Sequence, residues 1–310
     1  MAKVYERLAV VGCGLIGSSV LRAARKTGAA GTLAAFDVAP EVRAAVRRLG
    51  LADAAPESLA EAVAGADLVL LAVPPARIGE AAQACAPHLA PGATLTDVGS
   101  VKGVVAEAMS AAADLAGVHV IPGHPIAGTE QSGPEAGFAE LFQHRWCVLT
   151  PLDRPEADYH AAVARLADFW RALGSQVELM DARHHDLVLA VTSHLPHLIA
   201  YNIVGTADDL QTVAQAEVMK FSAGGFRDFT RIAASDPTMW RDVFLLNREA
   251  VLEILARFTE DLQALSRAIR WGEGEKLFEL FSRTRDIRRQ LIALGQESAE
   301  PNFGRDRTKG

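Results

Sequence analysis

The chain has 310 residues, which is long for one hydrophobic core and predicts two domains. Half of the residues are hydrophobic and 22% are charged, as in ordinary globular proteins. The net charge of -7 argues against a nucleic-acid partner, which would need a basic face. An acidic small molecule is still allowed, because its pocket needs only a few local cations.

The three cysteines and the hydropathy pattern address the compartment. Cys13, Cys85 and Cys147 lie far apart, so neither a disulfide framework nor a zinc site is predicted, and a reducing cytosol fits. The N-terminus leads straight into a predicted strand, with no cleavable apolar segment. We find no stretch that approaches the roughly 20 apolar residues of a membrane span. We therefore expect a cytoplasmic protein with no membrane partner.

The first half of the chain alternates short apolar runs with helical patterns. Buried strands are predicted at 7–12, 32–37, 67–73, 93–98 and 118–123, with helices between them, for example at 40–49 and 78–89. Apolar strands separated by helices indicate a parallel sheet that is covered on both faces. Two more strands, 147–150 and 176–180, flank a helix at 155–173 and are expected at the edge of this sheet.

Strand signals end near Asp181, and helical patterns follow at 182–206, 236–270 and 273–294. We therefore predict an α/β domain at residues 1–181 and an all-helical domain at 182–296. The remaining residues, 297–310, are polar and contain Pro and Gly, and we expect a flexible tail.

A glycine-rich phrase follows the first strand and opens a helix. Gly12 allows a tight turn, Gly14 lets a pyrophosphate approach the backbone, and Gly17 lets the helix pack on the strand. The helix N-terminus, with Leu15 and Ile16, supplies N–H groups for the phosphates. A glycine-rich turn in another kind of α/β protein is the alternative.

An acidic residue lies at the end of the second strand. Asp37 follows Gly17 by twenty residues, a spacing at which a carboxylate contacts the ribose hydroxyls and repels a 2′-phosphate. NAD is therefore favoured over NADP, although Arg43 is near enough in sequence to allow both.

Polar residues follow the next strands. Val73 and Pro74 end the third strand, Ser100 follows the fourth and His124 follows the fifth. Ligands bind at the carboxyl ends of strands in open parallel sheets, so these residues are expected in one crevice. Ser100 could instead, or also, cap the helix that follows it. His124 lies between glycine and proline, which predicts a stiff loop; its position favours function over a structural role.

The helical half contains two histidines three residues apart. His194 and His197 share one helix face, with Pro196 between them. No acidic third ligand lies at a useful spacing, so we predict core or substrate-facing histidines and no metal.

Arginines and aromatic residues alternate between 226 and 241. A solvated face of paired charges is one interpretation. The aromatic residues favour instead a partly buried anion pocket, in which Arg231 binds a carboxylate.

Five phrases in order give the chain a specific resemblance. They are "GCGLIGSS", "DVGSVKG", "GHPIAGTEQSG", "SHLPH" and "GGFRDFTRIAASDPTMWRD". Together they resemble the prephenate/arogenate (cyclohexadienyl) dehydrogenase family of tyrosine biosynthesis. The resemblance implies a Rossmann-type domain, a helical dimerisation domain, and oxidative decarboxylation of prephenate, arogenate or both with NAD or NADP.

The resemblance also implies roles for single residues. His124 matches the catalytic histidine that contacts the substrate hydroxyl, and Ser100 matches a serine that orients substrate and nicotinamide. Arg231 matches the arginine that holds the carboxylate lost as carbon dioxide. The other residues assigned to the substrate pocket are His197, His194, Thr129, Arg227 and Trp240.

The expected chemistry needs a base but no metal. A neutral His124 can accept the hydroxyl proton, a step typically worth about 10²–10⁴ in rate. Activity should then rise with pH through an apparent pKa of about 6.5 if the imidazole is unperturbed.

Two other functions compete with this one. A β-hydroxyacid-type dehydrogenase has a similar layout but needs a catalytic lysine, and Lys220 is the only lysine between 180 and 270. A non-catalytic NAD-binding sensor would need no polar set like Ser100, His124 and Arg231.

A homodimer through the helical domain is expected, because that domain carries more apolar length than it can bury alone. The apolar residues at helical spacing are Leu245, Leu246, Val251, Leu252, Leu255 and Phe258.

Overall fold

The structure is a computed structural model that describes residues 3–113, 117–129, 131–209 and 224–293. The chain divides into two compact units, Met1–Leu252 and Glu253–Gly310. Lys220 and the predicted tail 297–310 lie outside the described residues. The domain limits 1–181 and 182–296 stay predictions.

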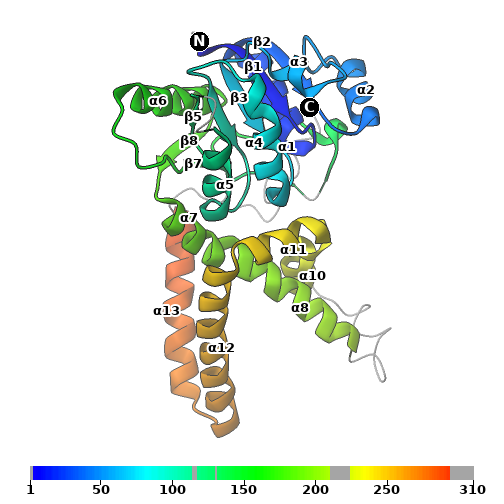
Figure 1. Ribbon diagram of the computed structural model, residues 1–310. Coiled ribbons are helices and arrows are strands. Elements are labelled where there is room, and N and C mark those ends of the chain that lie inside the picture. Colours follow the sequence, from blue (N-terminus) through cyan, green and yellow to red (C-terminus); the bar gives the residue numbers. More distant parts are fainter. Residues whose placement is uncertain (1–2, 114–116, 130, 210–223, 294–310) are drawn as a thin grey trace. The chain divides into compact units, whose positions relative to one another are not determined.

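A five-stranded parallel sheet forms the centre of the first unit (Figure 1), as the sequence predicted. Its strand order is β2-β1-β3-β4-β5. The strands are β1 (Tyr5–Val11), β2 (Ala30–Phe36), β3 (Leu68–Leu71), β4 (Thr94–Asp97) and β5 (His119–Val120). The order reverses beside β1, which pairs with both β2 and β3. A ligand crevice is therefore expected at the carboxyl ends of β1 and β3.

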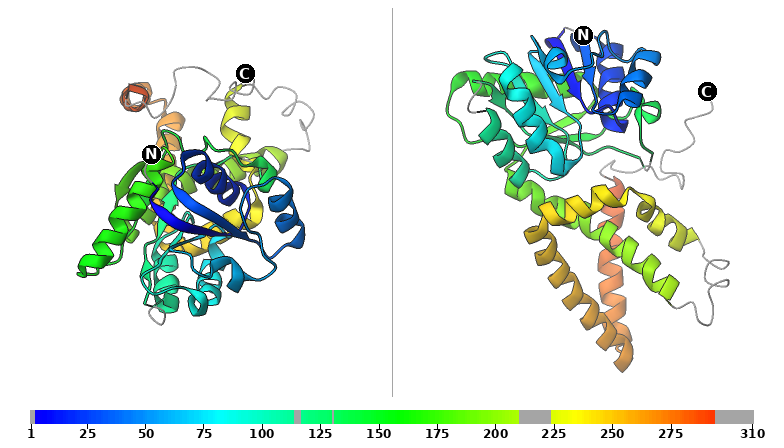
Figure 2. Two further views of the ribbon diagram at one scale, coloured as in Figure 1. Left: turned by 90° about the horizontal axis from the view of Figure 1, so that it is seen from above. Right: turned by 45° about the vertical axis from the view of Figure 1, so that its right-hand side comes forward.

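Alternate residues of each strand enter two separate cores. Leu8 and Val10 of β1 face the core that contains α1 (Leu15–Thr27) and α6 (Ala157–Ala172). Ala9 and Val11 face the core that contains α4 (Ile78–Cys85) and α5 (Gly103–Ala113). This two-sided burial explains why β1, β2 and β3 carry apolar side chains on both faces. Two short helices, α2 (Pro40–Arg48) and α3 (Leu59–Val63), complete this part, and Figure 2 shows it from two further directions.

A second sheet carries His124, which the sequence did not predict. Its strands are β6 (Gly123–Pro125), β7 (Trp146–Leu149) and β8 (Gln176–Leu179). The runs 147–150 and 176–180 are thus strands, but they do not extend the first sheet. His124 pairs with Val148 in an antiparallel ladder, so the prediction of a loop was wrong. Pro122 has no amide hydrogen and separates β5 from β6, which ends the first ladder there.

A buried ion pair ties the two sheets together. Asp97, at the end of β4, accepts hydrogen bonds from the amides of Gly99 (2.8 Å) and Gly123 (3.2 Å). Lys102 donates to the Asp97 carboxylate and to the Gly123 carbonyl, the latter at 2.7 Å. Both side chains are fully buried. Burial lowers the pKa of Lys102, and the Asp97 carboxylate opposes this shift. The pair therefore holds the residue before His124 by both its N–H and its C=O.

A long helical run follows the second sheet. Asp181 caps α7 (Ala182–Leu189) by accepting from two backbone amides. A π-helical turn, Ala190–His194, leads into α8 (Leu195–Asp209). By length and composition the run Ala182–Asp209 could cross a membrane. The prediction that no stretch approaches such a span was therefore wrong. One such helix is weak evidence, because core helices of soluble proteins meet the same criteria.

The remaining helices of the first unit include two short ones that the sequence did not predict and one that is shorter than predicted. They are α10 (Gly224–Thr230), a 3₁₀ turn at Arg231–Ala234, and α11 (Pro237–Leu246). The single helix predicted at 236–270 is broken at Asn247, and α12 (Arg248–Trp271) starts after it. The side-chain amide of Asn247 donates to the carbonyl of Asp186, so this residue joins α11 to α7.

The second unit contains most of α12 and all of α13 (Gly274–Ala293), joined by a tight turn at Gly272. Many of its apolar side chains are exposed in the single chain. They are Leu262, Ile269, Trp271, Phe278, Phe281 and Ile287. Exposed apolar surface of this extent is typical of a protein interface.

The buried ion pair gives a stability prediction. Lys102→Met leaves the Asp97 carboxylate buried without its cation, so we expect a loss of about 3–5 kcal/mol of unfolding free energy. Lys26→Met is the matched control, because Lys26 pairs with Glu140 at the surface and should cost less than about 1 kcal/mol. Denaturant unfolding measures both, and equal losses would contradict the assignment.

Candidate active site

The glycine-rich loop has the geometry of a phosphate-binding turn. Gly12 has φ +93°, and a Cβ there would lie 2.5 Å from the carbonyl oxygen of Ala72. A Cβ on Gly17 would lie 2.0 Å from the carbonyl oxygen of Gly12. A Cβ on Gly14 would meet no protein atom within 4 Å. Gly12 and Gly17 are thus needed by the fold, whereas the open space at Gly14 fits a dinucleotide.

The start of α1 adds donors to this loop. Gly14 is the N-cap, and no side chain caps the helix there. Leu15 and Ile16 form the first turn, so their amides belong to the positive end of the helix dipole. Val73 and Pro74 follow the neighbouring β3, where Val73 is half-buried and Pro74 exposed. These residues fit a nucleotide placed across the ends of β1 and β3.

Asp37 supports the loop from β2. Its carboxylate accepts from the amide of Cys13 at 2.8 Å and from the amide of Ala39 at 3.0 Å. Arg43 donates to the carbonyl of Asp37 at 2.8 Å, and its Nε donates to Glu57 at 3.1 Å. Arg43 is buried, and its guanidinium is already paired with Glu57.

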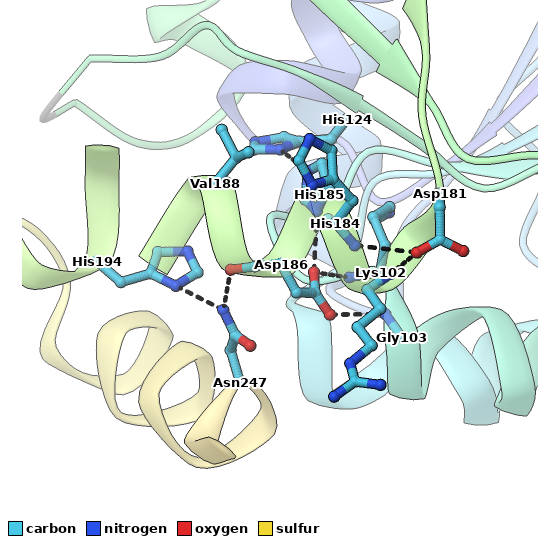
Figure 3. Close-up of polar contacts among 12 residues, drawn as sticks. Lys102, Gly103, His124, Asp181, His184, His185, Asp186, Val188, His194 and Asn247 are labelled. Atoms are coloured by element: carbon cyan, nitrogen blue, oxygen red, sulfur yellow. Dashed lines mark hydrogen bonds and ion pairs between the residues drawn. The ribbon is translucent and has the colours of Figure 1, made fainter. Parts of the chain in front are cut away.

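His124 belongs to a chain of three side chains (Figure 3). Its Nδ1 lies 2.9 Å from Nε2 of His185, and Nδ1 of His185 lies 2.9 Å from Oδ1 of Asp186. Burial lowers the pKa of His124 well below its ordinary value, and the neighbouring His185 and Lys102 lower it further. Burial also lowers the pKa of His185, against the opposing effect of Asp186. Both imidazoles are therefore neutral at neutral pH.

Ser100 lies in the turn between β4 and α5 and is half-buried. The sequence allowed it to cap α5, but Asp186 occupies that role. The Asp186 carboxylate accepts from the amides of Lys102 and Gly103, each at 2.8 Å. Within the described residues the Ser100 hydroxyl makes no hydrogen bond, which fits contact with a ligand.

A second group of aromatic and polar side chains comes from α8, the π-helical turn and α11. His197 stacks on Trp240 at 3.6 Å between ring centroids, and His194 meets the same ring edge-on at 6.0 Å. Nδ1 of His197 donates to the carbonyl of Ser193 at 2.9 Å. Nδ1 of His194 accepts from the amide of Asn247 at 3.1 Å.

This second group contains unused hydrogen-bond donors. Nε2 of His194 and Nε1 of Trp240 are buried, and neither has a partner among the described residues. Burial lowers the pKa of His194 to about 4, so the ring is neutral and its proton lies on Nε2. Buried donors normally have partners, so these two are available to a polar ligand.

The predicted arginines lie near this group but are exposed in the single chain. Arg231 opens the 3₁₀ turn and is close enough to lower the pKa of His197, although burial has the larger effect. Arg227 on α10 is also exposed, whereas the sequence favoured a partly buried pocket. Thr129 is exposed after β6, where its hydroxyl accepts from the amide of Gln131 at 3.2 Å.

Sequence reasoning missed three residues of this region. His185 and Asp186 connect His124 to α5, and Asn247 sets the orientation of His194. The only signal for the first two is the polar triplet at 184–186 at the start of an apolar helix. No group of three potential metal ligands occurs among the residues that the structure describes.

The fold and the site define an oxidoreductase with a nucleotide-binding α/β domain. Residues 20–179 match the nucleotide-binding domain of prephenate dehydrogenase, and residues 181–283 match its dimerization domain. The chain belongs to the prephenate dehydrogenase family, and it is a prephenate/cyclohexadienyl dehydrogenase of tyrosine biosynthesis.

Individual relatives support this assignment. The chain is 42% identical to the cyclohexadienyl dehydrogenase of Zymomonas mobilis over 93% of this chain and 97% of that protein. It is 30% identical to the prephenate dehydrogenase of Bacillus subtilis over 98% and 80%. The structure of Aquifex aeolicus prephenate dehydrogenase with hydroxyphenyl propionate and NAD⁺ superimposes with a TM-score of 0.84 at 33% identity, covering 92% and 98%.

The glycine loop gives a prediction that separates folding from binding. Gly14→Ala should change the unfolding free energy by less than about 1 kcal/mol, yet weaken NAD⁺ binding at least about tenfold, because the methyl group occupies open space that the pyrophosphate needs. Gly17→Ala should lower stability by about 1–3 kcal/mol, because its Cβ meets the Gly12 carbonyl. Calorimetric titration with NAD⁺ and denaturant unfolding measure the two effects. Unchanged NAD⁺ affinity in Gly14→Ala would place the cofactor elsewhere.

Proposed function

We propose that the chain oxidises and decarboxylates prephenate, arogenate or both with NAD⁺, and that His124 is the base. The observation that carries this proposal is a buried, neutral imidazole held next to the carboxyl end of β4, in a domain whose β1 ends in a glycine loop with open space for a dinucleotide. NAD⁺, when bound, accepts the hydride that leaves the substrate ring.

The surroundings of Asp37 support NAD⁺ over NADP⁺. A carboxylate at the end of β2 repels a 2′-phosphate and can accept from ribose hydroxyls. A phosphate would need a cation nearby. Arg43 is the nearest candidate in sequence, and it is engaged by Glu57 and by the carbonyl of Asp37.

His124 has one ring nitrogen for the substrate, because Nδ1 is engaged by His185. Its Nε2 accepts the proton of the substrate hydroxyl. The ring carbon that bears this hydroxyl loses a hydride and becomes a carbonyl carbon. Loss of the ring carboxylate as carbon dioxide then makes the ring aromatic. Ser100, in the turn that follows β4, orients the hydroxyl and the nicotinamide.

The second group of side chains binds the rest of the substrate. Arg231 pairs with a carboxylate, with Arg227 beside it on α10. His194 and Trp240 offer buried N–H donors, and His197 forms the stacked wall with Trp240. Thr129 contacts the substrate from the loop after β6. The Aquifex relative has been crystallised with hydroxyphenyl propionate, a carboxylate-bearing phenol, which fits this division.

Both substrates stay in the proposal. The Zymomonas relative is a cyclohexadienyl dehydrogenase, and a structure of Synechocystis arogenate dehydrogenase superimposes with a TM-score of 0.78 at 27% identity, covering 92% of this chain and 99% of that chain. Prephenate and arogenate differ only in a keto group against an ammonium group on the side chain.

Assembly and compartment follow from other observations. A homodimer would cover the exposed apolar side chains of α12 and α13, and the match to a dimerization domain supports it. The three cysteines are buried and unpaired, as expected in a reducing cytoplasm.

The two competing functions predict different results in one assay. A 3-hydroxyisobutyrate dehydrogenase from Mycobacterium tuberculosis superimposes with a TM-score of 0.52 at 16% identity, which shows the fold alone. Formation of NADH from NAD⁺ with prephenate, but not with 3-hydroxyisobutyrate, would support the proposal. Cofactor binding without turnover of prephenate or arogenate would favour a sensor.

The role of His124 predicts a kinetic and a pH effect. His124→Asn should lower kcat by about 10²–10⁴ with little change in KM, because asparagine cannot accept the proton. Only the neutral ring is a base, so activity is lost as the pH falls through the pKa of His124. Since burial lowers that pKa, we expect the acid limb below pH 6.5, rather than at the unperturbed value suggested by the sequence. An unchanged kcat and acid limb in the variant would assign the base elsewhere.

Arg231 predicts a binding effect instead. Its carboxylate partner is present before and during hydride transfer, so Arg231→Ala should raise KM by about 30-fold or more and change kcat little. Arg171→Ala is the control, because Arg171 pairs with Asp168 on the outer surface of α6. Steady-state kinetics with prephenate measure both, and equal KM values in the two variants would refute the role.

A further inference from the structure

We propose that His185 and Asp186 are positioning residues that fix the tautomer of His124 and receive the charge created when His124 accepts a proton. The inference deepens the proposed function and rests on it. It follows from the polarity of the hydrogen bonds that join the three side chains (Figure 3).

The donor and acceptor roles in this chain are set first at Asp186. Its Oδ1 accepts from the amide of Lys102, and its Oδ2 accepts from the amide of Gly103, each at 2.8 Å. Two backbone donors at the start of α5 stabilise the ionised carboxylate, which can only accept. Nδ1 of His185, at 2.9 Å from Oδ1, must therefore carry a proton and donate it.

The tautomer of His124 follows from that of His185. Because neutral His185 has its proton on Nδ1, its Nε2 is an acceptor. Nδ1 of His124 lies 2.9 Å from this nitrogen and must donate to it. The proton of neutral His124 is therefore on Nδ1, and the lone pair of Nε2 is left for the substrate. Without this chain, the imidazole could take the other tautomer, which is unable to act as a base at Nε2.

The same contacts provide a place for the positive charge. When Nε2 of His124 takes the substrate proton, Nδ1 can pass its own proton to Nε2 of His185. The products are a neutral His124, protonated on Nε2, and an imidazolium at His185 beside the Asp186 carboxylate. After the product leaves, the reverse transfer to Nδ1 and loss of the Nε2 proton to solvent restore the starting state.

The surrounding charges favour this transfer. Lys102, Cys147 and the neutral His194 are the titratable groups that face the pair from other elements, together with Asp97. Lys102 disfavours a cation at either ring, but only at His185 do the carboxylates of Asp186 and Asp97 oppose this effect. Transfer of the proton from His124 to His185 therefore places the positive charge next to the Asp186 carboxylate.

Three substitutions distinguish a role in setting the tautomer of His124 from a purely structural role. His185→Leu removes the acceptor for Nδ1 of His124, and Asp186→Asn removes the carboxylate charge that would stabilise an imidazolium at His185. We expect kcat to fall by about 10²–10⁴ in both, with KM little changed. His185→Gln can still accept from His124 and donate to Asp186, so it should recover at least about tenfold of the kcat lost in His185→Leu. His184→Gln is the matched control on the exposed neighbour and should keep the wild-type rate.

A spectroscopic measurement tests the tautomer without substrate. In ¹⁵N-histidine spectra of the full-length protein at neutral pH, His124 should be protonated at Nδ1 in the wild type and should lose this preference in His185→Leu, which removes the acceptor of that proton. Protonation of His124 at Nε2 in the wild type, or a kcat in His185→Leu within about twofold of the wild type, would overturn the inference. If Asp186→Asn fails to fold, the wild-type spectrum and the two His185 variants still decide it. Failure of the wild type to oxidise prephenate or arogenate would instead refute the proposed function, and the spectra would stay interpretable.

Discussion

The buried pair of Asp97 and Lys102 is the constraint on which the site depends. The first sheet ends before Pro122, and β6, the strand that carries His124, belongs to another sheet. Asp97 binds the amide of Gly123 and Lys102 binds its carbonyl, so the backbone before His124 is fixed relative to the end of β4. An ion pair out of water is costly unless its remaining donors and acceptors are satisfied. Here the backbone of Gly99 and Gly123 adds three hydrogen bonds to the pair, and these bonds fix the position of β6 relative to β4.

Asp186 extends this constraint into the helical region. Its carboxylate binds the amides of Lys102 and Gly103, so it caps α5 in place of Ser100. Its own carbonyl accepts from Asn247, between α11 and α12, and Asn247 also donates to His194. One residue thus links the nucleotide-binding sheet to the two histidine groups. Asp186 therefore contacts His185 directly and His194 through Asn247, in both cases by hydrogen bonds.

The sequence predicted the first sheet and the glycine loop because both depend on local patterns. Apolar runs bounded by helices define parallel strands, and the open space at Gly14 is a property of three spaced glycines. The separate second sheet was missed, because strand partners are long-range: β6 pairs with β7 more than twenty residues later. The roles of His185 and Asp186 were missed for the same reason. The local sequence does not distinguish a polar residue on a helix surface from a polar residue that caps a different helix.

The electrostatics of the site assign different tasks to histidine and arginine. Burial lowers the pKa of all the histidines that line the two groups, His124, His185, His194 and His197, so none supplies a permanent positive charge at neutral pH. Neutral rings can accept or donate protons during a reaction without attracting a carboxylate to the wrong end of the pocket. Arginine stays charged at any working pH, and the charge of Arg231 is close enough to His197 to lower its pKa. Under the proposed function, this difference would orient a substrate that has an anionic carboxylate and a neutral hydroxyl, with its carboxylate at Arg231 and its hydroxyl at His124.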